Sequence, residues 1–377
     1  MARHYLDHAS TSPLRPEAKA AMLAELEAQA GDPGRVHEEG RAVRTRLEDA
    51  RAQIADALGV RPRQVILTSG GTEAINAAVF GATRSSAHGR IALAKVEHSA
   101  VRDASDRAGR VVEIAVDRVG RIDLESLADA VRSSHPALVH CQWANHEVGT
   151  LQPVQQAVAI CRDAGVPIHV DACCALGQAD LDLGSLHADL VSLSAHKAGG
   201  PAGIGALVIS PTLRLEPFIV GGQQERARRG GMENVAAAAG FGALCTILSS
   251  PGRLGSETAR ATANAQTVLR AATGVDGVEE LGDPDPAGRL ASIVCISVKG
   301  VEAEPVVVGL DRLGVAVHSG SACSSEALEP SPVLAAMGVD ADHSLRVSVG
   351  WSTTHDDVAA FTRHFGTVVA GLRSLRS

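Results

Sequence analysis

The chain contains 377 residues, of which 45% are hydrophobic, and its formal net charge is −8. This charge and an aromatic content of 2% argue against a nucleic-acid-binding protein, which needs basic surface and side chains that stack on bases. No apolar stretch is long enough to cross a membrane, and residues 1–13 lack the apolar core of a signal peptide. We therefore predict a cytoplasmic protein that binds neither nucleic acid nor membrane.

Strand-like and helical segments alternate along residues 44–210. Residues 44–60 have helical periodicity, and residues 63–82 have the pattern of a strand, a glycine turn and a helix. This alternation predicts βαβ units and a mostly parallel sheet with helices on both faces. Further helices are expected at 123–134 and 154–165, and further strands within 89–100, 109–116, 135–150, 166–178, 188–200 and 203–210.

A second, smaller unit is predicted from the remainder of the chain. Pro251 and Gly252 interrupt a helical stretch, and a long helical pattern follows them. Strands are expected within 291–300 and 343–350, with a helix after them. We predict a large domain at residues 15–250 and a small α+β domain formed by residues 1–14 and 251–377.

Polar residues cluster where the predicted parallel strands end, and ligands of such folds bind at the carboxyl ends of the strands. Lys197, one of only four lysines, follows a buried strand, and Asp171 ends another. This pair suits pyridoxal phosphate, because its aldehyde joins a lysine amine and its pyridinium nitrogen needs an anion. A solvated loop lysine and a helix-capping or turn aspartate are the structural alternatives.

The segment TSGGTEAIN, residues 68–76, leads from a strand through two glycines into a helix. Backbone N–H groups at such a helix start bind phosphate, and Thr72 adds a hydroxyl; a plain strand-to-helix turn explains the pattern equally well. His98 suits stacking on a cofactor ring, although capping a helix or packing in the core is the simpler explanation for a single histidine. Ser194 and His196, near Lys197, are candidate donors to a phosphate and a ring.

The chain has seven cysteines, an odd number with no CxxC pair, which argues against a disulfide framework or a structural zinc site. Cys323 differs from the others because small and polar residues surround it in HSGSACSSEALEP, residues 318–330. Such a segment packs little, so we expect a mobile loop at about residues 318–332. The thiol is either incidental or has to move in order to act.

Nine segments together resemble the cysteine desulfurases, which are class V aminotransferase-like members of the fold-type I pyridoxal-phosphate enzymes. The resemblance covers nearly the whole chain, and the Cys323 loop resembles the long type of the iron–sulfur assembly branch. It implies an α/β fold with a mostly parallel seven-stranded sheet, a smaller α+β domain, and a homodimer. The segments are YLDHASTSPLRPEA, TSGGTEAIN, VEHSAV, WANHEVGTLQP, IHVDA, SLSAHKAGGPAGIGAL, GGQQERARRGG, SGSACSSEALEPSPVL and SLRVSVG.

The resemblance also implies roles for individual residues. Lys197 would form the covalent link to pyridoxal phosphate, Cys323 would accept the sulfur as nucleophile, and His98 would stack on the ring and relay protons. Arg346 would clamp the substrate carboxylate, a task that suits a guanidinium, and Asn145 would also bind the substrate. The residues expected to bind the cofactor are Gly71, Thr72, His98, His146, Asp171, Cys174, Ser194, His196 and Lys197.

Three positions depart from the family pattern. His146 replaces the second asparagine of an Asn-Asn-Glu segment, which normally contacts cofactor and substrate. Cys174 replaces a glutamine that donates to the phenolic oxygen of the cofactor, and a thiol is a poor donor. Met232 replaces a threonine that the partner subunit offers to the phosphate. Each lost contact is worth on the order of 1 kcal/mol.

The expected reaction converts L-cysteine to L-alanine, leaves a persulfide on Cys323, and passes that sulfur to an acceptor protein. Three alternatives remain open from the sequence. One is another pyridoxal-phosphate-dependent C–S or C–Se lyase, such as a selenocysteine lyase or a pathway-specific paralogue. The second is a degenerate, non-catalytic homologue that keeps the fold, and the third is a redox sensor at Cys323.

Overall fold

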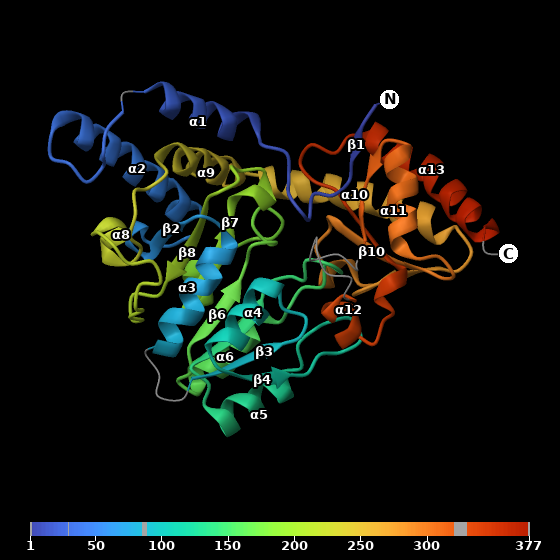
Figure 1. Cartoon of the computed structure of the whole chain (residues 1–377), viewed down its shortest axis with the longest axis horizontal. Coiled ribbons are helices and arrows are strands. Elements are labelled where there is room, and N and C mark those ends of the chain that lie inside the picture. The colour runs from blue at the N-terminus through green and yellow to red at the C-terminus, as the bar shows by residue number, and fades with distance from the viewer. Residues whose placement is uncertain (1, 29, 85–88, 320–329, 376–377) are drawn as a thin grey trace.

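The computed structural model describes residues 2–28, 30–84, 89–319 and 330–375, and its larger sheet has seven strands in the order β2-β8-β7-β6-β5-β3-β4 (Figure 1). β8 is antiparallel to both of its neighbours, and every other adjacent pair is parallel. The predicted mostly parallel seven-stranded sheet is therefore confirmed. The strands are β2 (Val65–Thr68), β3 (Arg90–Ala94), β4 (Arg110–Ile114), β5 (Leu138–Gln142), β6 (Ile168–Asp171), β7 (Leu190–Ser194) and β8 (Gly205–Ile209).

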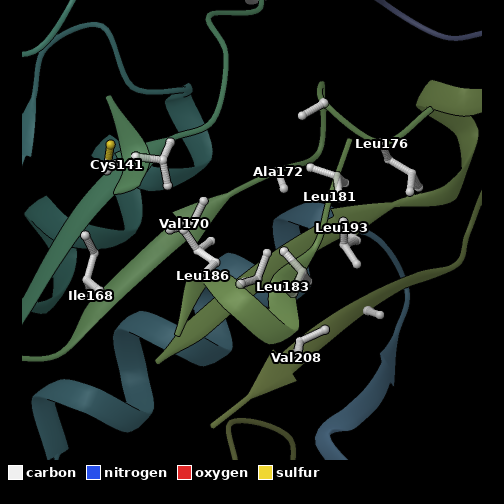
Figure 2. Close-up of a cluster of buried hydrophobic side chains, with 14 of the residues drawn as sticks. Cys141, Ile168, Val170, Ala172, Leu176, Leu181, Leu183, Leu186, Leu193 and Val208 are labelled. Carbon is white, nitrogen blue, oxygen red and sulfur yellow. The ribbon is translucent and has the colours of Figure 1, made fainter. Parts of the chain in front are cut away.

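Helices cover both faces of this sheet because its strands alternate apolar side chains between two cores. Leu138 and Leu190 pack on α3 (Gly71–Arg84) and α4 (Ser99–Ala108), whereas Cys141 and Leu193 belong to the core of the other face. Figure 2 shows part of that second core, where Leu183 and Leu186 lie against the strands. Its helices are α2 (Glu38–Ala57), α5 (Leu124–Ser134), α6 (Val154–Asp163), α7 (Leu183–Leu186) and α9 (Val235–Leu248), and α1 (Pro16–Glu27) packs on α9.

A smaller antiparallel sheet, in the order β12-β13-β10-β9, organises most of the C-terminal third. Apolar residues of this sheet pack on α10, α11 and α13 in a core of their own. The first strand of the chain, β1, pairs in parallel with β11 beside this sheet (Figure 1). The elements are β1 (His4–Tyr5), β9 (Val278–Leu281), β10 (Ile293–Val298), β11 (Val315–Ala316), β12 (His318–Ser319), β13 (Ser344–Ser348), α10 (Arg253–Thr273), α11 (Ala303–Arg312), α12 (Pro332–Ala336) and α13 (His355–Ser374).

Side-chain caps define several helix starts. Asp123 accepts hydrogen bonds from the backbone N–H groups of Glu125 and Ser126 at the start of α5. Thr354 and Asp357 form a reciprocal capping box at the start of α13. The remaining helical turns are α8 (Gln224–Ala227), η1 (Pro62–Gln64), η2 (Ala195–Ala198), η3 (Pro286–Gly288) and η4 (Ala341–His343).

The predicted cysteine loop is only partly within the described residues. His318 and Ser319 form β12, and Ser331 caps α12. Cys323 lies outside the described residues. Among the residues that are described, no single helix has the length and apolar character of a membrane span, and only the bent pair α9 and α10 meets that test jointly. The predicted domain boundaries at residues 15 and 250 stay a prediction.

Candidate active site

A cavity of about 410 Å³ lies at the carboxyl ends of β5, β6 and β7. Its volume is within the range of small-molecule sites, roughly 300–1,000 Å³. All the residues predicted to bind the cofactor line it, namely Gly71, Thr72, His98, His146, Asp171, Cys174, Ser194, His196 and Lys197. These residues are far apart in the sequence, and the structure brings them to one edge of the sheet, as we expected.

Lys197 lies in the short helical turn η2, directly after β7. Its Nζ donates a hydrogen bond to the carbonyl oxygen of Ala9 at 2.6 Å. Gly199 has a φ of 88°, in the left-handed region that favours glycine, and it ends the turn. The amine is therefore presented to the cavity from a tight turn and is positioned by the segment that contains Ala9.

Asp171 is the last residue of β6, and its side chain is buried. Its Oδ1 accepts hydrogen bonds from the backbone N–H of Cys173 and from Ser192 Oγ, both at 3.0 Å. These donors orient the carboxylate at the wall of the cavity. Glu97 is buried nearby, and burial, followed by the charge of Asp171, raises its pKa to about 8. Glu97 is therefore protonated at neutral pH, and Asp171 is the anion expected to face the cofactor nitrogen.

His98 caps a helix and also lines the cavity, while its stacking on a cofactor ring stays a prediction. It is the N-cap of α4, where its Nδ1 accepts from the backbone N–H of Ala100 at 3.1 Å, and it also lines the cavity. Burial lowers the pKa of His98, so the ring is neutral with its proton on Nε2. Its ring lies edge-to-face against His146, with centroids 4.9 Å apart, and burial lowers the pKa of His146 strongly. Two histidine rings whose pKa values burial lowers thus form this part of the cavity wall.

The start of α3 offers the expected anion site. Gly70 has a φ of 154°, which favours glycine, and Gly71 is the first helical residue. A Cβ atom on Gly71 would lie 2.4 Å from Cys173 Sγ, so only glycine fits between the helix and the sulfur. Thr72 and Ser194 line the cavity at this end, next to the helix start. On the same wall, burial and the charge of Lys197 lower the pKa of His196 to about 4.

Arg346 and Asn145 are both buried but do not line this cavity. The amide of Asn145 is engaged at both ends: Nδ2 donates to the Val96 carbonyl, and Oδ1 accepts from the N–H groups of Glu147 and Val148. The guanidinium of Arg346 donates to Asp7, Ser10 and the carbonyl of His146. Their substrate-binding roles stay predictions.

Two groups of site residues escaped the sequence analysis. One is residues 7–12, which contact Lys197, His196 and Arg346; the segment YLDHASTSP was part of the resemblance, but no role was drawn from it. The other is Gln142 and Cys173, which line the cavity. Their positions at or just after strand ends were the available signal. Met232 is 64% exposed and does not line the cavity.

The residues present fit pyridoxal phosphate. One cavity presents a lysine amine, a buried and hydrogen-bonded carboxylate, a neutral imidazole face and the N-terminus of a helix. These are the partners that an aldehyde, a pyridinium nitrogen, an aromatic ring and a phosphate require. Cys174, at the place of a family glutamine, also lines the cavity, and burial raises the pKa of its thiol.

Comparisons with known proteins agree with this site. The chain is 37% identical to "Cysteine desulfurase IscS" of Dictyoglomus turgidum over 94% of this chain and 91% of the relative. It is also 37% identical to "IscS-like cysteine desulfurase" of Mycobacterium tuberculosis, over 94% and 93% of the two chains. The structure of a NifS-like protein matches with a TM-score of 0.90 and 26% identity, over 98% of this chain and all of that one.

The match to a family model covers most of the chain, residues 4–361, and the family is described as aminotransferase class-V. The matched residues include the large sheet, the residues of the cavity, and nearly all of the smaller sheet with its helices. The chain therefore belongs to the aminotransferase class-V family, with the fold of the fold-type I pyridoxal-phosphate enzymes.

Proposed function

We propose that this protein is a pyridoxal-phosphate-dependent cysteine desulfurase that converts L-cysteine to L-alanine and transfers the sulfur, through a persulfide on Cys323, to an acceptor protein. The observation that carries the proposal is the convergence of Lys197, Asp171 and His98 on one cavity. The relatives named cysteine desulfurase, which match over nearly the full length of the chain, support the same reaction.

Pyridoxal phosphate, when bound, supplies an electron sink that stabilises negative charge developing at the substrate Cα. Lys197 Nζ is the base that removes the Cα proton and later returns a proton to the carbon skeleton. His98, with its proton on Nε2, lines the same cavity and can donate a hydrogen bond to the reacting groups. Burial lowers the pKa of His98, so its ring adds no second positive charge beside Lys197 at neutral pH.

The sulfur step needs a second thiol besides that of the substrate. The Cys323 thiolate attacks the substrate sulfur, so an S–S bond forms while the Cβ–S bond breaks. The electron pair of the broken bond stays with the carbon skeleton, which takes up a proton at Cβ to become L-alanine. One cysteine and one thiol thus give one alanine and one persulfide, with no external oxidant. Cys174 is not suited to be the attacking thiolate, because burial raises the pKa of its thiol and keeps it protonated.

Substrate orientation is proposed to depend on Arg346, which would bind the carboxylate of L-cysteine, and on Asn145. Arg346 lies on β13, and its guanidinium donates to the backbone carbonyl of His146, a residue of the cavity wall. A guanidinium in this position can bind a carboxylate with two hydrogen bonds. Asn145 acts by fixing the turn that presents His146, because its Oδ1 accepts from the two N–H groups that follow His146 and its Nδ2 ties the turn to the Val96 carbonyl.

The test is to mix the holoenzyme with L-cysteine, map the added sulfur by peptide mass spectrometry, and measure alanine. We expect one extra sulfur atom on the Cys323 peptide and one alanine per sulfur released. Cys323→Ala should retain cofactor absorbance but lose alanine formation, and Ser324→Ala, in the same segment, is the matched control and should keep it. Alanine formation that survives in Cys323→Ala would favour a lyase that needs no protein thiol. Absence of cofactor absorbance after added pyridoxal phosphate would favour a non-catalytic homologue.

We also propose a homodimer in which the segment of residues 222–232 lies at the interface. Phe218, Val220 and Met232 expose 42%, 77% and 64% of their surfaces, and backbone hydrogen bonds from Gly230 to Ile219 and from Gly231 to Gly221 bring their segments together; exposed apolar side chains that gather in this way mark interaction surfaces. Light scattering should give twice the chain mass of 38.8 kDa. A monomer in solution would contradict the proposed homodimer and leave the proposed reaction untouched. We further propose a large domain at residues 15–250 and a small domain at residues 1–14 and 251–377. The remaining proposals are a cytoplasmic location and the use of the sulfur in iron–sulfur cluster assembly.

A further inference from the structure

Residues 7–12 join the proposed reaction centre to the proposed substrate anchor. On one side, Lys197 Nζ donates to the Ala9 carbonyl, and Thr11 Oγ1 lies 3.0 Å from His196 Nδ1. On the other side, Asp7 contacts Arg346, and the backbone N–H of Ala9 donates to Ser348 Oγ at 2.9 Å. This short segment therefore contacts both groups with which an amino-acid substrate would interact.

The guanidinium of Arg346 is already committed to protein partners. Its Nη2 donates to Asp7 Oδ1 at 2.9 Å and to Ser10 Oγ at 2.7 Å, and its Nη1 donates to the His146 carbonyl at 2.9 Å. Within the part of the chain that the structure describes, only Nε of this guanidinium has no hydrogen-bond partner. Any two-point contact with an incoming carboxylate must include Nη1 or Nη2, so it must involve a nitrogen that Asp7, Ser10 or His146 already uses.

The ion pair also changes the charge that a substrate meets. The side chain of Arg346 is only 4% exposed, whereas that of Asp7 is 19% exposed, and the two are 2.9 Å apart. Solvent screens such a buried pair weakly, so the Asp7 carboxylate repels a second carboxylate at the same guanidinium. Ser10 Oγ donates to the same Oδ1 at 2.9 Å and itself accepts from Arg346 Nη2, so Asp7 keeps one hydrogen bond when a ligand draws the guanidinium away.

We propose that Asp7 is a built-in carboxylate ligand of Arg346 that competes with the carboxylate of the substrate and of the product. Asp7 thereby determines how tightly amino-acid carboxylates bind and how readily the product is exchanged for new substrate. The inference rests on the proposed function, in which Arg346 binds the substrate carboxylate. It assigns Asp7 a role in specificity, since a ligand must offer more than a negative charge in order to replace a carboxylate that is already bound.

The test compares a ligand that has the carboxylate with one that lacks it. L-alanine and L-alaninamide, which has a neutral amide in place of the carboxylate, are titrated into the wild-type holoenzyme, Asp7→Asn and Asp7→Ser, by calorimetry. Removing a competing charge worth on the order of 1 kcal/mol should tighten L-alanine binding about fivefold and leave L-alaninamide unchanged. KM for L-cysteine should fall by a similar factor, with no matching rise in kcat.

Asp311→Asn is the matched control. It removes one charge from another ion pair of the N-terminal segment, that of Arg3 with Asp311, in which both side chains are more than half exposed. Asp311→Asn should leave the affinity for both L-alanine and L-alaninamide unchanged. Weaker or unchanged binding of L-alanine to both Asp7 variants would overturn the inference, since that is the result for a residue that only positions Arg346.

Arg346→Gln separates this inference from the proposed function. It should weaken L-alanine binding and abolish the preference for L-alanine over L-alaninamide. If Arg346→Gln behaves so and the Asp7 variants do not tighten binding, the competition by Asp7 is refuted while Arg346 keeps its role. If Arg346→Gln leaves L-alanine binding unchanged, the substrate anchor itself is wrong, and the inference is refuted together with it.

Discussion

The contact between Gly71 and Cys173 gives a sharp test of how the cavity is built. A Cβ on Gly71 would lie 2.4 Å from Cys173 Sγ but 3.5 Å from Ser194 Cβ and 3.7 Å from Cys173 Cβ. Only the sulfur is therefore too close, since the two carbon contacts are ordinary ones. Overpacking of this kind costs about 1–3 kcal/mol, so Gly71→Ala should lower the free energy of unfolding by that amount.

The clash has one source, so removing the sulfur should relieve it. Cys173→Ala alone should cost on the order of 1 kcal/mol, because a buried sulfur loses its packing contacts. In the double variant the alanine at position 71 faces only the Cβ atoms of residues 173 and 194, at ordinary contact distances, and most of the penalty should disappear. We expect a favourable coupling energy of about 1–2 kcal/mol between the two sites.

Urea unfolding of the four cofactor-free proteins measures this coupling, and titration with pyridoxal phosphate shows whether the helix start recovers its anion site. Gly255→Ala is the matched control, because Gly255 is an exposed helical residue of α10 with open space around its Cβ direction. It should stabilise the protein by about 0.5–1 kcal/mol. Additivity of the Gly71 and Cys173 changes within about 0.5 kcal/mol would refute the reasoning.

Three further predictions concern buried charge and the departures from the family pattern. Glu225→Gln should cost about 3–5 kcal/mol of unfolding free energy, because it leaves the Arg51 guanidinium buried without its carboxylate partner at 2.6 and 2.7 Å; a urea midpoint like that of the wild type would contradict this. Burial raises the pKa of Glu97 from its ordinary value of 4.5 to about 8 in the folded protein, so the folded state binds one more proton than the unfolded state between these pH values. The unfolding free energy should therefore decrease as pH rises from about 5 to 8, and Glu97→Gln should remove that part of the slope in urea titrations at several pH values. Cys174→Gln should tighten pyridoxal-phosphate binding about fivefold by restoring an amide donor, as measured by absorbance titration, and unchanged affinity would mean that the cavity does not present residue 174 to the cofactor.

The cavity could be anticipated because its residues follow a rule that the sequence displays. Asp171 ends one short apolar strand and Lys197 lies in the turn after another, and parallel strands bring their carboxyl ends to one edge of a sheet. The direction of β8 could not be anticipated, since a buried strand has the same apolar composition whether it runs parallel or antiparallel to its neighbours.

Contacts between distant segments account for the rest of what the sequence did not reveal. Nothing in the order of residues near Asp7 indicates that its partner is Arg346, and nothing near Glu225 indicates Arg51. Such pairs depend on how whole layers pack, and local periodicity is insensitive to packing. The role of Asn145 illustrates the same limit, because its amide fixes a backbone turn that only the folded chain displays.

The pairing of β1 with β11 means that the first strand of the chain can be completed only late in synthesis. Asp7 and Arg346 are 339 residues apart in the chain, and β1 has no partner strand until β11 has been made. Contacts between such remote segments form late in folding, and during translation the early segment must stay unpaired while the large sheet assembles. Ala9, whose carbonyl accepts from Lys197 and whose N–H donates to Ser348, therefore gains its full set of contacts only once residue 348 has emerged from the ribosome.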